Sequence, residues 1–83
     1  MDKIITCEIS FIPILSEDYR KDVDQVLEII SSYELECNVG LLSTTIRGRK
    51  EIIFEMIRKV FGAMENKTKF TMDIKLSNEC GCS

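Results

Sequence analysis

The chain has 83 residues, a net charge of −3 and no basic stripe, so a nucleic-acid-binding surface is not expected. It has no histidine, which excludes His-based catalytic triads and most zinc sites. We expect one domain over residues 1–83. It should be cytoplasmic, because the N-terminus has no signal-peptide pattern and no apolar run approaches the ~20 residues that cross a bilayer.

The first half of the chain predicts a strand, a helix and a second strand. Residues 3–14 alternate between apolar and mostly polar side chains, which is typical of a strand. Ser16 is the predicted N-cap of the helix that follows, with Glu17 and Asp18 in its first turn. An apolar stripe from Tyr19 to Ile30 marks its buried face. Residues 34–39 alternate again, and Gly40 marks a turn or bulge.

The second half predicts a strand, a helix and a last strand. Residues 41–48 form the third strand, with Leu42, Thr44 and Ile46 on one face, and Gly48 is interpreted as the turn into a helix over 49–65. Asn66 is the expected C-terminal cap of that helix. The predicted buried stripe of this helix consists of Ile53, Phe54, Ile57, Val60, Phe61 and Met64. The last strand is predicted over residues 69–77.

The order β-α-β-β-α-β predicts an α+β, ferredoxin-like sandwich. Right-handed crossovers put both helices on one face of a four-stranded antiparallel sheet, with the first and third strands in the centre. The other face of this sheet carries mostly polar side chains and is either a solvated surface or a binding surface. Its central strands carry small hydroxyls, which leave room for a ligand and can donate or accept hydrogen bonds.

Three segments carry a family resemblance. The run S-T-T-I-R-G at 43–48 followed by a helix with I-I-F-E-M-I-R-K-V-F, the strand E-I-S-F-I-P-I at 8–14 and the terminal G-C resemble the YkoF-like, thiamine-binding protein family. The resemblance implies a ferredoxin-like domain that pairs sheet to sheet and carries or senses thiamine or its hydroxymethylpyrimidine part without catalysis. A single domain would then pair with a second copy, as a dimer or tetramer.

The positions that match the family are Ser10, Ser43, Thr44, Thr45, Arg47 and Gly48, and the chemistry of the outer face adds Glu8, Asn38 and Asp73. Hydroxyl and amide groups there can pair with an aminopyrimidine, and a carboxylate can stabilise a thiazolium cation. The predicted ligand-binding residues are Ser10, Ser43, Thr45, Glu8, Asn38, Arg47 and Asp73.

Structural roles are open for several of these positions. Glu8 could instead form a salt bridge to Lys75 or Arg47 across the sheet, and Arg47 could tie down a carboxylate such as Glu36. Thr44 matches the family as well, but the alternation turns it toward the helices, so we interpret it as a core residue.

From the four cysteines we expect neither a metal site nor a cofactor. Cys7 and Cys37 are interpreted as core residues of their strands. Cys80 and Cys82 could chelate a soft metal or form a strained disulfide, but two thiolates are an incomplete zinc site unless two tails meet across a dimer. We therefore expect a tail with reactive thiols.

An enzyme is not predicted, because the loop after the first strand is acidic and lacks the glycines of an anion-binding loop, and no nucleophile is paired with a base. The central strands also lack the exposed aromatics of RNA-binding proteins with this fold. We predict a non-catalytic binding protein for a thiamine-like molecule. The alternative is a regulatory or interaction domain whose sheet face only joins subunits.

Overall fold

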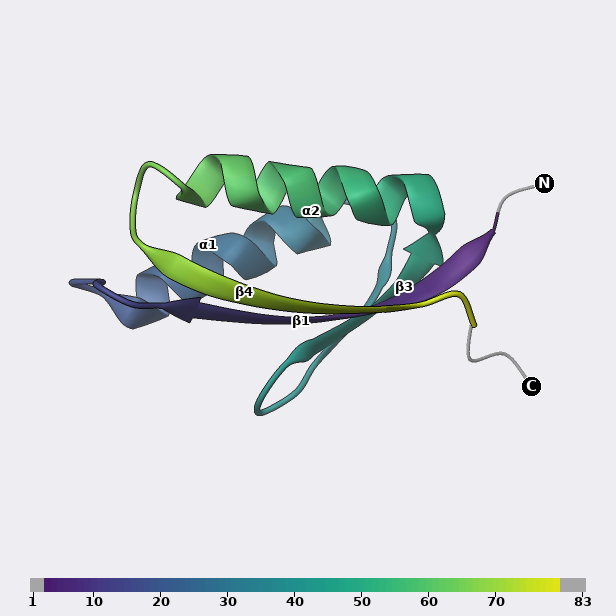
Figure 1. The fold of residues 1–83 in the computed structure, drawn as a ribbon, viewed down its shortest axis with the longest axis horizontal. Helices are drawn as coiled ribbons and strands as arrows, with labels where there is room; N and C mark the ends of the chain where they lie inside the picture. The colour runs from purple at the N-terminus through teal and green to yellow at the C-terminus, as the bar shows by residue number, and fades with distance from the viewer. Residues whose placement is uncertain (1–2, 80–83) are drawn as a thin grey trace.

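The computed structural model describes residues 3–79 and confirms the predicted order of elements. The strands are β1 (Ile4–Pro13), β2 (Glu36–Val39), β3 (Thr44–Arg49) and β4 (Phe70–Ser77), and the helices are α1 (Tyr19–Ser31) and α2 (Lys50–Met64). The strands form one antiparallel sheet in the order β2-β3-β1-β4. Both helices cover the same face of this sheet, and the β2–β3 hairpin extends to the opposite side (Figure 1).

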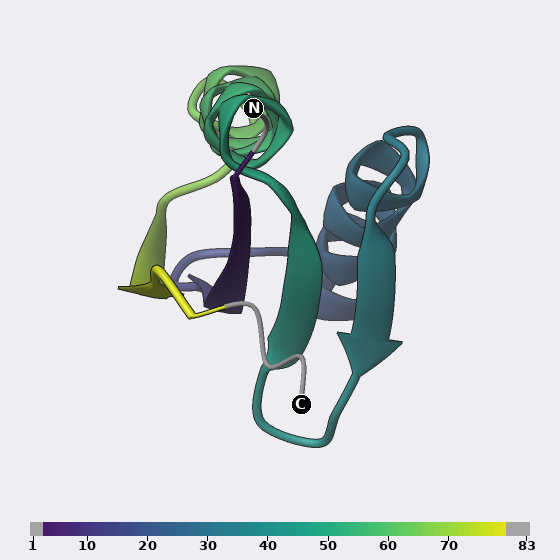
Figure 2. The same cartoon turned by 90° about the vertical axis from the view of Figure 1, so that its right-hand side faces the viewer.

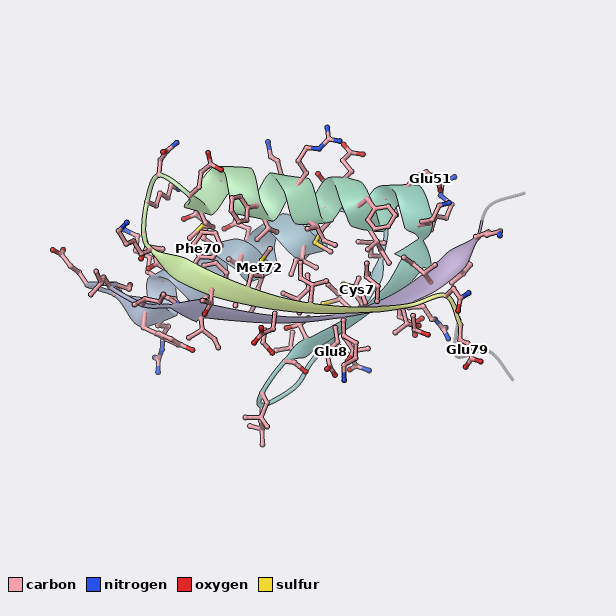
Figure 3. The ribbon with its side chains drawn as sticks, in the orientation of Figure 1. Cys7, Glu8, Glu51, Phe70, Met72 and Glu79 are labelled. Atoms are coloured by element: carbon pink, nitrogen blue, oxygen red, sulfur yellow. The ribbon has the colours of Figure 1, made fainter. Side chains whose placement is uncertain are left out.

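The core lies between the sheet and the two helices. Its buried side chains come from β1, β3 and both helices: Ile5, Cys7, Ile9, Ile46, Val26, Ile30, Ile53, Met56, Val60 and Met64. Phe70 and Met72 of β4 point toward α2 (Figure 3), and the Phe70 ring lies 4.8 Å from Phe11 and 5.3 Å from Phe61, centroid to centroid. Aromatic contacts therefore close the β4 side of the core.

The buried face of α2 differs in part from the predicted stripe. Ile53, Val60 and Met64 are buried as predicted, but Met56 is also fully buried, whereas Phe54 and Phe61 are 47% and 49% exposed. The four buried residues follow the three- and four-residue spacing of one helical seam, and the two phenylalanines flank it. The prediction was wrong there because it placed the large side chains of Phe54 and Phe61 at the centre of the buried face of α2.

The predicted helix caps were wrong by one or two residues. Asp18 is the N-cap of α1, and its carboxylate accepts a hydrogen bond from the Lys21 amide at 3.2 Å. The Ser16 hydroxyl instead contacts the Asp22 carboxylate and accepts from the Asp18 amide at 3.2 Å. At the end of α2, Glu65 occupies the C-cap in place of Asn66. Short polar side chains in succession compete for the same role, so sequence spacing alone chose the wrong one.

The third strand begins later than predicted, because residues 40–43 form the hairpin turn. The Gly40 amide donates to the Ser43 carbonyl at 2.8 Å, and Leu41 and Leu42 are 104% and 91% exposed. The placement of Leu42 on the core face is therefore wrong. Reversing the chain between β2 and β3 requires these residues. β3 therefore begins at Thr44, which pairs with Val39, the last residue of β2.

Two further predictions fail at the sheet edge and in β3. Cys37 was predicted in the core but is exposed, like every residue of the edge strand β2. Its partner on β3, Ile46, is buried on the helix side. Gly48 is not a turn into the helix: it lies within β3, opposite Ile5, and the strand continues to Arg49. Cys7 and Thr44 are buried as predicted.

Candidate functional site

Strand register aligns the predicted polar residues in rows across the outer face of the sheet. Asn38 pairs with Thr45, Thr45 with Glu8, and Glu8 with Lys75, so one row crosses all four strands. Side chains at directly opposed positions point to the same face, with Cβ atoms ~5 Å apart. Glu8 points away from the helices (Figure 3). The register thus brings an amide, a hydroxyl, a carboxylate and an ammonium group together.

A second row lies toward the hairpin. Ser10 pairs with Asp73 of β4, and the Ser10 hydroxyl donates a hydrogen bond to the Leu42 carbonyl oxygen at 3.0 Å. Ser10 and Ser43 both line a partly enclosed hollow of about 120 Å³ between α1 and the hairpin. The two serines therefore line the same hollow at the hairpin, where Ser43 directly precedes β3.

The third row contains Arg47. Glu36, Arg47, Thr6 and Ser77 follow one another across the sheet. The Arg47 Nη2 lies 2.6 Å from Glu36 Oε2, which confirms the ion pair given as its structural alternative. The Glu8 side chain is exposed on this face.

A second hollow brings three predicted residues together on the outside of the hairpin. Asn38, Ser43 and Thr45 line it, and it is open to solvent, with a volume of about 480 Å³. Glu8, Arg47 and Asp73 line neither of the two hollows. The sequence reasoning missed Val39 and Leu42, which line both hollows. The signal that could have found them is the short segment from Gly40 to Ser43 between two strands, which is typical of a hairpin turn.

Burial raises the pKa of the Cys7 thiol to about 11, and the charge of Glu8 adds to the shift. Cys7 is therefore a protonated core residue and no nucleophile at neutral pH.

The described part of the chain offers no candidate metal centre. No group of three or more Cys, Asp or Glu side chains able to hold a metal occurs within residues 3–79. Cys80 and Cys82 lie outside the described residues. No helix of this range is long and apolar enough to cross a membrane.

Comparisons with known proteins agree with this architecture. The sequence model of the family described as "Thiamine-binding protein" matches residues 7–81. A Thermotoga maritima protein described as a candidate for thiamine biosynthesis or salvage is 22% identical, with a TM-score of 0.83 over 94% of this chain and 86% of that chain. No protein of curated function matches the sequence.

Two further solved structures have the same fold. A domain of unknown function from Bacillus cereus is 18% identical, with a TM-score of 0.81 over 96% of this chain and 80% of that chain. A hypothetical protein from Methanocaldococcus jannascii is 17% identical, with a TM-score of 0.84 over 98% of this chain and 86% of that chain.

Proposed function

Since the chain belongs to the thiamine-binding protein family, we propose that it binds thiamine or a hydroxymethylpyrimidine-like precursor on the outer face of its sheet. It would act without catalysis, as a single cytoplasmic domain in a homo-oligomer. The observation that carries the proposal is the row Asn38–Thr45–Glu8, which the register places beside the open hollow lined by Asn38, Ser43 and Thr45.

The chemistry of this row matches the two parts of thiamine. An aminopyrimidine has ring-nitrogen acceptors and an exocyclic amine donor, and the hydroxyls of Ser43 and Thr45 with the Asn38 amide can satisfy both. The thiazolium is a permanent cation, and the carboxylate of Glu8 can stabilise it. Ser10 and Asp73 extend the same polar surface on the next row, and Arg47 bounds it on the other side.

Self-association would complete the site. The hollow beside Thr45 is open to solvent, and a ligand held there would be exposed on one side. Exposed apolar residues lie at this end of the molecule: Ile12, Val39, Leu41 and Leu42. Apolar groups on such a surface favour contact with another protein surface. A second copy laid sheet to sheet would cover both the ligand and these side chains, in a dimer or a tetramer.

Calorimetric titration with two ligands tests the assignment of Glu8. In the variant Glu8→Gln we expect affinity for thiamine to fall about tenfold, because a charge–charge contact is lost. Affinity for neutral hydroxymethylpyrimidine should stay nearly unchanged. Glu51→Gln, which removes the same charge from α2 on the far side of the sheet (Figure 3), is the matched control.

The hydroxyls are tested by Thr45→Val and Ser43→Ala, which should weaken both ligands because both contain the pyrimidine. Equal affinity of all variants would remove this face from the site. If neither compound binds the wild-type protein or raises its melting temperature while the protein still self-associates, the proposal fails. The alternative of an interaction domain would then stand.

A further inference from the structure

The β4 strand forms a long open edge of the sheet. It is the last strand in the order β2-β3-β1-β4 and runs for eight residues, whereas β2 at the other edge has four. Figure 2 shows β4 at the margin of the sheet, with α1 at the opposite side. Ile74 and Leu76 of this edge are 37% and 45% exposed. Long edges with unpaired backbone groups and apolar side chains are templates for pairing with another strand.

The hydrogen bonds to β1 fix which backbone groups of β4 point outward. The Ile14 amide donates to the Lys69 carbonyl at 2.7 Å, in line with the register that pairs Pro13 with Phe70. Bonded and non-bonded pairs alternate along an antiparallel ladder. Asp73 and Lys75 therefore turn their backbone groups toward β1, while those of Met72, Ile74 and Leu76 point out of the sheet. The lack of an amide hydrogen at Pro13 fits the same phase.

Charge then selects one register for a second β4. Antiparallel pairing of two copies through the outward groups allows Ile74 to lie opposite itself, which puts each Asp73 opposite the Lys75 of the other copy. Shifting to the next bonded register in one direction puts Asp73 opposite Asp73, and in the other direction Lys75 opposite Lys75. Opposite charges at such positions stabilise a strand pair and like charges destabilise it.

We propose that two copies of this chain pair edge to edge through β4, with a two-fold axis at Ile74. The Asp73 and Lys75 side chains then form two ion pairs on the outer face, at positions where opposed side chains approach closely. On the helix side, Met72 of one copy lies opposite Leu76 of the other, which covers apolar surface that the single chain exposes. The two sheets become one continuous sheet. This contact uses the edge and leaves the outer face of both copies open, and it requires no ligand.

Sedimentation equilibrium and amide hydrogen exchange test the contact in the ligand-free protein. The amides of Met72, Ile74 and Leu76 should be protected in the assembly and lose protection on dilution, while those of Asp73 and Lys75 stay protected by β1. Asp73→Lys and Lys75→Asp should each weaken association about tenfold or more, since two attractive pairs become repulsive. The double variant should recover most of it.

A matched variant separates the backbone from the charges. Ile74→Pro removes an outward amide and no bond to β1, so it should abolish the edge contact, whereas Ile74→Val should keep it. A monomeric wild-type protein, unprotected outward amides, or an assembly unaffected by either charge reversal would overturn the proposal. Because all measurements omit ligand, their failure leaves the thiamine titrations unaffected.

Discussion

The Ser10 hydroxyl of β1 holds the β2–β3 hairpin by donating a hydrogen bond to the Leu42 carbonyl oxygen, 3.0 Å away. Ser10→Ala removes this tie, and we expect the free energy of unfolding to fall by ~1 kcal/mol, the ordinary value of one hydrogen bond. Amide exchange of residues 40–43 should also quicken. Ser10→Thr keeps the donor and should behave like the wild type. Unchanged exchange in the alanine variant would show that the turn holds itself.

Asp18 caps α1 by accepting the Lys21 amide. Asp18→Ala should lower the free energy of unfolding by ~1 kcal/mol, because an amide at the helix start loses its partner. Asp18→Asn retains an acceptor and should recover most of the loss. Urea denaturation measures both, with Glu17→Ala as the neighbouring control. A larger effect of Ser16→Ala than of Asp18→Ala would instead favour Ser16 as the cap.

Much of the fold was predictable because the apolar alternation in β1 and β4 and the helical spacing in α2 are long patterns. Cys7, Ile9 and Ile46 follow the period of two and are buried. Such patterns predict which face of a strand is buried. The β-α-β-β-α-β order followed from them, and the arrangement of the sheet followed from the handedness of the connections.

The errors arose where an outcome depends on neighbours rather than on period. Cys37 has the alternation of a core residue, but its strand is at an edge of the sheet and all four of its residues are exposed. Leu42 also has the right spacing, but the chain must reverse there. The rows on the outer face required the register between strands, so the alignment of Asn38 and Glu8 with Thr45 could not be read from any single strand.

The Leu35 side chain packs over Gly48. A Cβ at this position would overlap the Leu35 Cδ2 atom. Gly48→Ala should therefore cost up to ~1 kcal/mol of stability, because the end of the Leu35 side chain must move. In a Leu35→Ala background the same substitution should cost much less, since the obstructing atom is gone. A double-mutant cycle by urea denaturation measures the coupling. Equal costs in both backgrounds would place the need for glycine in the backbone and not in this contact.

The Arg47–Glu36 ion pair is short, but it lies at the surface. The two side chains are 37% and 65% exposed, so solvent screens the interaction. We expect Glu36→Gln to lower the free energy of unfolding by less than ~1 kcal/mol. The loss should shrink further in high salt. Thermal denaturation at low and high ionic strength measures it, with Glu34→Gln as a control outside this pair. A large, salt-independent loss would contradict a surface role.

The buried Cys7 thiol makes stability fall at alkaline pH. Its pKa is about 11, against 9.0 for an ordinary thiol, because burial and the charge of Glu8 disfavour the thiolate. Its contribution is full below pH 9.0, where both states are protonated, and is lost as the pH rises toward 11, because only the unfolded state deprotonates. The loss should reach about 3 kcal/mol. Urea denaturation of the wild type and Cys7→Ala across this range isolates it from other titrating groups. Parallel pH curves would contradict the assignment.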